Sequence, residues 1–246
     1  EILAQLVPAL SVRSVGLSVI RSGVKESIPD QTVVIGAPPA VGLVRVDMIQ
    51  WNGTTLNAKA GTAAAISSAD APTPDVGFIP LALTLVFNGD TTIRNMGFLD
   101  SSSASKGRIY AYYFARRGIY AASQAAQDFV AVATNFDETE VVLPIYHPRS
   151  STIRIKTVGC LSIGASSLGG IQATLRFDGT LITRSQAKQQ FNTSPTSADS
   201  GNVDQVESTF PRAGVAIGSH RWVTNWTLRT TGGTLSYRLM ELQEII

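Results

Sequence analysis

The segment IQATLRFDGTLITR, residues 171–184, is the clearest indication of the fold in this chain. A strand-like run ends at Phe177, the pair Asp178-Gly179 follows, and Thr180 begins a second strand-like run. Asp-Gly is a strong hairpin signal because a type I′ turn needs positive φ at both central residues. Threonine after the turn favours the returning strand. The segment therefore predicts an antiparallel hairpin with its turn at 177–180.

Three further hairpins are predicted on similar grounds. They lie at 51–54, where the run 44–51 meets Asn52-Gly53; at 87–91, where the apolar run 78–87 meets Asn88-Gly89 and a strand-like pattern resumes over 91–99; and at 229–234, where 221–229 meets a Thr-Thr-Gly-Gly turn. Other stretches also fit strands, and helix is scarce. The best helical stretch is 183–191, with weaker ones at 1–10 and 121–128.

Many short strands joined by long loops predict an all-β protein, a double-sheet β-sandwich of jelly-roll-like form. We expect residues 1–20 to form an N-terminal arm and 21–246 to form one large sandwich domain. A division into two domains near 148–151 is the alternative. Loops of the length of 60–77 and 192–202 are typically functional, contact neighbours or are mobile.

Composition narrows the function classes. The 246 residues are 44% hydrophobic and only 15% charged, with a net charge of +2. Charges are spread along the chain, so there is no strong nucleic-acid patch, and Arg116-Arg117 is interpreted as a solvated turn. The longest apolar runs are about ten residues, half of what a membrane-spanning helix needs, so no membrane partner is expected. One cysteine, Cys160, excludes an internal disulfide framework and is interpreted as a buried thiol.

No motif for catalysis, metal or cofactor stands out, and we expect no enzyme activity and no cofactor. Asp199-Ser200-Gly201 has no second copy to form a carboxylate dyad, and the acidic run 137–140 lacks the glycine of a calcium loop. The two histidines are His147 and His220. One or the other is the best candidate if the chain is an enzyme, acting with a carboxylate that the fold brings near.

Aromatic residues near the chain's end offer a possible ligand-binding surface. Trp222, Trp226 and Tyr237 could form a platform on which a sugar ring stacks. Trp222, Trp226 and Leu228 share one parity in a strand and therefore one face, as do Leu235, Tyr237 and Leu239. Core packing is the alternative for the same residues.

In general character the whole chain resembles bacteriophage and viral virion structural proteins of β-sandwich type. The resemblance rests on its Ser-, Thr-, Ala- and Gly-rich β pattern, low charge, single cysteine, long small-residue loops and apolar first twenty residues. It implies a capsid, decoration or tail component, non-enzymatic, that self-associates into a symmetric homo-oligomer with other virion proteins and resides in the virion, assembled in the host cytoplasm. Low surface charge would reduce the desolvation cost of such contacts. The candidate assembly contacts are Leu3, Leu6, Leu10, Asp70, Pro72 and Pro74. A carbohydrate- or receptor-binding β-sandwich module, with a glycan partner, is the alternative.

Overall fold

The computed structural model describes residues 1–95, 107–112, 120–125, 129–130, 136–163, 168–184, 188–191, 202–228 and 234–245. These residues form strands and turns and contain no helix. Every strand pairing among them is antiparallel except that of β9 with β10. No helix in this part of the chain has the length and hydropathy needed to cross a bilayer.

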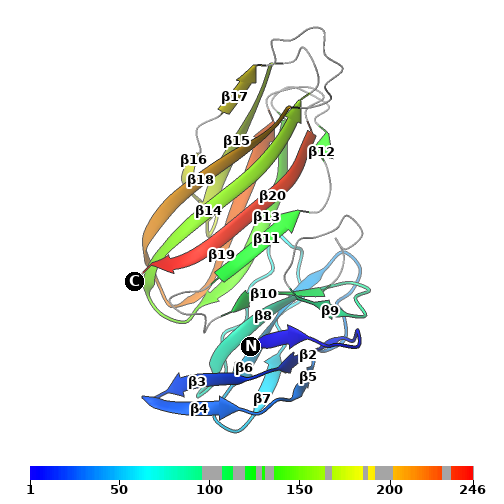
Figure 1. Ribbon diagram of the computed structural model, residues 1–246, viewed down its shortest axis with the longest axis vertical. Helices are drawn as coiled ribbons and strands as arrows, with labels where there is room; N and C mark the ends of the chain where they lie inside the picture. The colour runs from blue at the N-terminus through cyan, green and yellow to red at the C-terminus, as the bar shows by residue number, and fades with distance from the viewer. Residues whose placement is uncertain are drawn as a thin grey trace.

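The largest sheet has ten strands and runs through the length of the molecule (Figure 1). Its order is β18 (Asn202–Val215), β14 (Ser151–Ile163), β20 (Thr234–Ile245), β11 (Tyr120–Ala125), β10 (Gly107–Tyr112), β8 (Ile79–Phe87), β6 (Val44–Trp51) and β7 (Leu56–Lys59), with β12 (Phe129–Val130) beside β20 and β9 (Ile93–Arg94) beside β10.

Three smaller sheets complete the fold. The five-stranded sheet contains β13 (Phe136–His147), β19 (Gly218–Leu228), β15 (Leu168–Phe177) and β16 (Thr180–Arg184) in that order, with β17 (Lys188–Phe191) also beside β15. A three-stranded sheet is formed by β1 (Ile2–Ala4), β2 (Ser11–Ser14) and β5 (Thr32–Val34), and a two-stranded ribbon by β3 (Leu17–Arg21) and β4 (Val24–Ile28).

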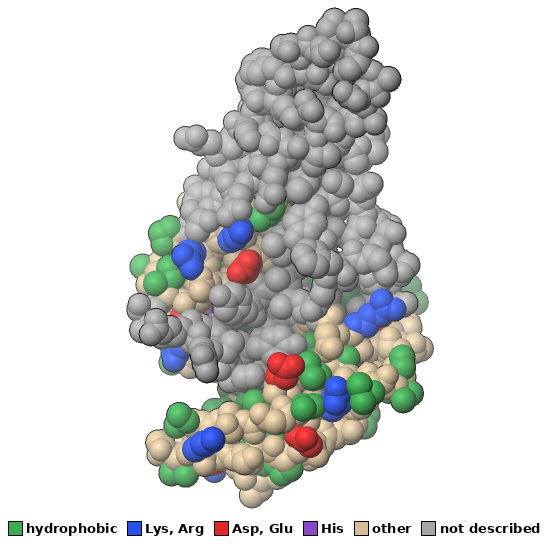
Figure 2. Space-filling view, viewed as in Figure 1, with side chains coloured by type: hydrophobic (Ala, Val, Ile, Leu, Met, Phe, Trp, Pro, Cys, Tyr) green, Lys and Arg blue, Asp and Glu red, His purple; other side chains and the backbone are tan. Residues whose placement is uncertain are grey.

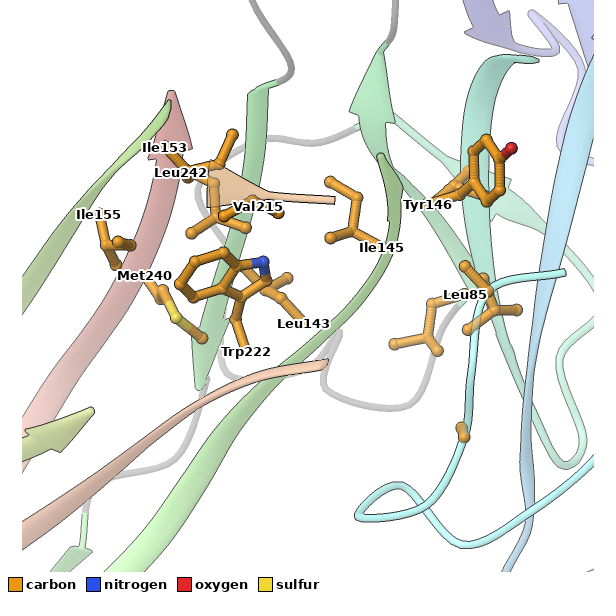
Figure 3. Packing of buried hydrophobic residues seen from close by; sticks show 14 of the residues in the cluster. Leu85, Leu143, Ile145, Tyr146, Ile153, Ile155, Val215, Trp222, Met240 and Leu242 are labelled. Atoms are coloured by element: carbon orange, nitrogen blue, oxygen red, sulfur yellow. The ribbon is translucent and has the colours of Figure 1, made fainter. Parts of the chain in front are cut away.

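Strands β6 and β8 are covered on both faces. One face is covered by the sandwich core, which lies between the five-stranded sheet and the large sheet (Figure 3). This core includes Val44, Val46, Met48, Leu83, Leu85, Leu143, Ile145, Ile153, Trp222, Met240 and Leu242. On the other lies the N-terminal core, which includes Ile2, Val12, Leu17, Val19, Ile28, Ile49, Trp51, Ala82, Val86 and Ile109. A strand buried on both faces has a continuous apolar sequence instead of an alternating one, as residues 78–87 do.

Two of the predicted hairpins are confirmed. Phe177 pairs with Thr180, and both Asp178 (φ 47°) and Gly179 (φ 78°) have the positive φ that a type I′ turn requires. At 51–54, β6 and β7 pair antiparallel with Trp51 opposite Leu56. This second turn is wider than a two-residue turn because Asn52 Oδ1 accepts hydrogen bonds from the amides of Thr54 and Thr55.

The hairpin predicted at 87–91 is wrong, although its turn forms. Gly89 has φ 76° and the amide of Asp90 donates to the carbonyl of Phe87, yet the following chain does not return along β8. β8 is already flanked by β6 and β10, and the short β9 pairs in parallel with β10. A turn signal reverses the chain without determining which strand it pairs with.

The hairpin predicted at 229–234 is also wrong. β19 pairs with β13 and β15 in the five-stranded sheet, whereas β20 lies between β14 and β11 in the large sheet. β19 and β20 therefore lie in different sheets of the sandwich. Two half-buried strands that face each other across a core have the same alternating pattern as two that are hydrogen-bonded neighbours.

The helical interpretations are wrong where the structure describes them. Residues 188–191 form β17, residues 2–4 form β1 and residues 120–125 form β11. Sheet pairing outweighs the weak local preference of these short segments. The predicted all-β sandwich is confirmed, while its jelly-roll form and its division into domains stay predictions. The turn at 148–150 joins β13 to β14, which belong to the two facing sheets.

Candidate functional site

A fully buried histidine lies at the end of β13, beside Trp222 of β19. The indole Nε1–H of Trp222 donates a hydrogen bond of 3.1 Å to Nε2 of His147. Because an indole nitrogen only donates, His147 Nε2 must be unprotonated and the ring is neutral with its proton on Nδ1. That Nδ1 has no hydrogen-bond partner among the described residues. Burial, and secondarily the charge of His220, lowers the pKa of His147 from 6.5 to about 4.

The second histidine is held between two acceptors. His220 Nδ1 lies 2.7 Å from Asp178 Oδ2, and His220 Nε2 lies 3.1 Å from the carbonyl oxygen of Ala216. When both ring nitrogens carry a proton, each donates to one of these acceptors, and the protonated ring forms an ion pair with Asp178. Asp178 also accepts a hydrogen bond from the backbone amide of Arg221. The type I′ turn presents Asp178 to β19.

Aromatic rings connect the two histidines. The ring of Phe177 stacks on His220 with centroids 4.8 Å apart and contacts Trp222 at 4.5 Å. The centroids of His147 and His220 are 5.5 Å apart. The guanidinium of Arg212 lies 5.3 Å from the centroid of Phe177. The result is a compact group of two imidazoles and two aromatic rings at one end of the sandwich core.

The 60–77 loop attaches to the same end of β19. Ser219 Oγ donates to the carbonyl of Ala71 at 2.5 Å, and Arg221 bonds the carboxylate of Asp70 at 2.6 Å and the carbonyl of Ala69 at 3.4 Å. We call these contacts the loop clasp. Ala69 and Ala71 are buried in the sandwich core, so the loop covers apolar surface.

An ion pair between a buried carboxylate and an exposed guanidinium lies beside this group. Glu244 of β20, with 2% of its side chain exposed, accepts two hydrogen bonds from the guanidinium of Arg149, at 2.7 and 2.5 Å. The hydrogen bonds from Arg149 hold the pKa of Glu244 below its ordinary value. The pair ties the turn after β13 to β20.

The tryptophans predicted to stack on a ligand lie in the core. Trp222 and Trp226 are both 0% exposed, and Trp222 packs among Met240, Leu143 and Ile153 (Figure 3). A buried indole presents no face to a sugar ring, so the ligand-stacking role is corrected to core packing for these two residues. Tyr237 lies in β20 opposite Cys160, and the side chains of both lie outside the described residues.

The predicted assembly contacts have different environments. Leu6 is 82% exposed, whereas Leu3 is half-buried and Leu10 packs against the N-terminal core. Asp70 is bound within the chain by Arg221, and Pro72 and Pro74 are half-buried in the same loop. The middle of the 60–77 loop thus contacts its own chain, and Leu6 is the most exposed of the six.

The sequence singled out His147 and His220 and expected a carboxylate near one of them. The structure supplies Asp178 beside His220 and Glu244 near His147, but sequence analysis missed these two carboxylates and Arg221. A possible signal was the Asp-Gly turn itself, whose first residue projects from the end of the sheet. Among the described residues, no group of three or more His, Cys, Asp and Glu could hold a metal ion. Arg116-Arg117, Asp199-Ser200-Gly201 and the side chains of 137–140 lie outside the described residues.

No family model matches the chain, and no curated protein matches it. Among solved structures, the chain is similar to dimeric latent PorU from Porphyromonas gingivalis, with 22% identity over 48% of this chain and 10% of that one and a TM-score of 0.32. It is also similar to the insecticidal delta-endotoxin Cry8Ea1 from Bacillus thuringiensis, with 10% identity, a TM-score of 0.31, and coverage of 100% of this chain and 52% of that one. A third similar structure is that of the Gx strain of infectious bursal disease virus, with 12% identity, a TM-score of 0.28, and coverage of 100% of this chain and 62% of that one.

The chain spans a tenth, about half and about three fifths of the length of these three chains. Likeness at such TM-scores carries no argument about what the chain does. The fold class and the residues at the candidate site are therefore the basis of the functional proposal.

Proposed function

We propose that the chain is a non-enzymatic virion structural protein, a capsid, decoration or tail component that self-associates into a symmetric assembly. One observation carries the proposal. Large aliphatic side chains stand in solvent on the N-terminal part of the chain, including Leu6 at 82% and Val7 at 78% exposed. Figure 2 shows hydrophobic side chains, in green, on the surface at the lower end of the view, where Figure 1 places β2 to β7.

Leu6 and Val7 form an apolar tip between β1 and β2. Further exposed aliphatic side chains of the N-terminal part are Ile20, Val24, Val34, Val41 and Val76. Contiguous exposed apolar surface marks protein contacts, whereas single exposed aliphatic side chains are ordinary, so the adjacent pair Leu6 and Val7 is the part of this surface that supports a contact with a second copy. The low charge of the chain, 15% of its residues, supports the same role because few ions would be desolvated on contact.

The test is the mass of the purified protein by light scattering over a wide concentration range, with negative-stain images of the same fractions. We expect discrete multiples of 26.1 kDa that form rings, shells or other symmetric particles. A monomer at every concentration overturns the proposal.

A matched pair of variants locates the contact. The double variant Leu6→Asp, Val7→Asp places charge at the apolar tip and is expected to shift the mass to the monomer. Leu181→Asp, at a 44% exposed position on β16, makes the same kind of change elsewhere and is expected to leave the mass unchanged. Assembly that persists in the double variant contradicts the role of the tip.

A further inference from the structure

We propose that His147 and His220 form an acid-sensitive switch that releases the middle of the 60–77 loop from β19 when His147 gains a proton. The inference goes beyond the assembly role and holds whether or not the chain self-associates. It rests on the donors and acceptors around the two rings and on the position of the loop clasp.

The first step is the hydrogen bond between Trp222 and His147. His147 Nε2 accepts the indole proton at 3.1 Å and must be unprotonated to do so. A second proton on the ring would place Nε2–H against the indole N–H, two donors facing each other. Both side chains are 0% exposed, so water cannot replace the lost contact without opening the site. Protonation and the present packing of His147 exclude each other.

The second step is repulsion between the rings. His220 Nδ1 lies 2.7 Å from Asp178 Oδ2, and the ring centroids of the two histidines are 5.5 Å apart. A charged His147 would place two imidazolium rings side by side. Burial, together with His220, already holds the pKa of His147 at about 4.

Among the described residues, the carboxylates of Glu244 and Asp178 favour a charged His147 and offset part of this repulsion, but burial and His220 outweigh them. Glu244 acts on His147 from β20, but both its oxygens are already bonded by Arg149. Asp178 is shared between His220 and the amide of Arg221. Arg212 lies against Phe177 and adds positive charge, while Asp70 is bonded by the Arg221 guanidinium.

The third step links the rings to the loop. Ser219 and Arg221, which hold Ala69, Asp70 and Ala71, are the immediate neighbours of His220 in β19. A shift of His220 away from a charged His147 therefore moves both donors of the loop clasp together. The three hydrogen bonds of the loop clasp and the burial of Ala69 and Ala71 depend on the positions of Ser219 and Arg221.

Release is confined to the middle of the loop. At its start, Ala64 and Val44 exchange two backbone hydrogen bonds, and at its end Asp75 bonds Lys59 and Gln50. These anchors lie on β6 and β7, whereas the histidines lie on β13 and β19. Residues 65–72 thus open as a strap between two fixed points and expose the end of the sandwich core, including the sites of Ala69 and Ala71.

Amide hydrogen exchange on the full chain tests the switch, with protection factors corrected for the intrinsic effect of pH. The amides of Ser68 and Ala69 both donate to the carbonyl of Ala65 and report on the strap. The amide of Ala64 donates to Val44 and is the internal control. We expect the protection of Ser68 and Ala69 to fall about 20-fold from pH 7 to pH 5, as linkage to one such histidine requires, and that of Ala64 to stay constant.

Two variants isolate the cause. His147→Gln keeps an acceptor for Trp222 and cannot titrate, so its strap is expected to stay protected at pH 5. Arg221→Gln cuts the loop clasp directly and is expected to lower protection at pH 7 as well. Equal protection of the strap at both pH values in the natural chain overturns the proposal, and so does an undiminished loss in His147→Gln.

A direct titration covers the case in which His147→Gln fails to fold. The indole N–H resonance of Trp222 in the natural chain reports the protonation of His147 through their hydrogen bond. Its midpoint is expected at the pKa of His147 in the closed chain, about 4, which is the pH at which the loss of strap protection levels off. A loss that continues more than one pH unit below this midpoint would show that another group opens the strap.

Discussion

The indole N–H of Trp51 donates a hydrogen bond of 2.9 Å to Glu26 Oε2 and ties the β3–β4 ribbon to β6. The other oxygen of Glu26 accepts from Arg21 Nε at 2.7 Å. Two-stranded ribbons are marginal in water by themselves. This ribbon is kept in place by the burial of Leu17, Val19 and Ile28 and by this single carboxylate.

Glu26→Ala is expected to lower the free energy of unfolding by about 1–3 kcal/mol, because it leaves the buried Trp51 N–H without an acceptor. Urea unfolding followed by tryptophan fluorescence measures it. Lys25→Ala, at an exposed position on the neighbouring residue of β4, is the control and is expected to change it by less than about 0.5 kcal/mol. Equal changes in the free energy of unfolding in the two variants would contradict the anchoring role of Glu26.

Gly61 lies where a side chain has no room. A Cβ at this position would lie 2.2 Å from the backbone carbonyl oxygen of Val46, which belongs to a central strand and cannot move freely. Gly61→Ala is therefore expected to cost about 2 kcal/mol or more of unfolding free energy, as overpacking does. Thermal and urea unfolding measure the loss.

Gly77→Ala is the matched control for this steric effect. Gly77 has φ 81° and nothing within 4 Å of an added Cβ, so an alanine there meets backbone strain alone, about 1 kcal/mol. A larger loss at Gly77 than at Gly61 would contradict the close approach of residue 61 to β6.

The Arg149–Glu244 pair predicts a strongly one-sided double-mutant cycle. Arg149→Ala leaves the buried carboxylate of Glu244 without its two donors and is expected to cost about 1–2 kcal/mol, less than in a fully buried pair because 57% of the Arg149 side chain is exposed and water replaces part of its contact. Because the pKa of Glu244 then rises, the loss is present at neutral pH and shrinks as acid neutralises the carboxylate.

Adding Glu244→Gln to Arg149→Ala is expected to recover part of the loss, since a neutral amide is less costly to bury unpaired. Arg154→Ala, on an exposed position of β14 that contacts Gln243, is the control and is expected to be nearly neutral. A cycle with no coupling between residues 149 and 244 would contradict the pair.

His147 predicts a loss of global stability in acid. Its pKa is about 4 in the folded chain and about 6.5 in the unfolded one, so the unfolded chain binds the proton more readily. Stability is therefore full above pH 6.5, falls as the pH drops towards 4, and loses about 3 kcal/mol over this window. Urea unfolding at pH 7 and pH 4.5 measures the difference.

Carboxylates such as Glu244 also lose stabilising contacts in acid, so the contribution of His147 is obtained by subtraction. The difference between pH 7 and pH 4.5 is expected to be smaller in His147→Gln by about 2–3 kcal/mol. An identical pH dependence in both proteins would show that His147 titrates at its ordinary value.

The fold class follows from local patterns, and strand pairing follows from them only in part. The Asp178-Gly179 turn was predicted with its neighbours because both strands meet within two residues. At Asn88-Gly89 the turn forms, but β10 occupies the edge of β8 that the returning chain would have needed. Local chemistry determines where the chain turns, and competition between distant strands determines where it pairs.

The candidate site shows the same division. The shared parity of Trp222 and Trp226 correctly placed them on one face, and burial decided between a stacking platform and a core. The contact of His220 with Asp178 depends on the register of β15 and β19, in which Phe177 lies opposite Trp222. That register joins residues more than forty positions apart, which a pattern of neighbours in the sequence does not contain.

The central position of β20 in the ten-stranded sheet has a consequence for biosynthesis. Val44, Val46 and Met48 emerge early from the ribosome, but the core they line is completed by Met240 and Leu242. β20 also fills the gap between β14 and β11, so both strands keep an open edge until it is made. Such long-range pairing slows folding and leaves unpaired strand edges exposed until β20 has been synthesised. Nascent chains stalled before residue 234 are therefore expected to bind chaperones more strongly than the full chain does.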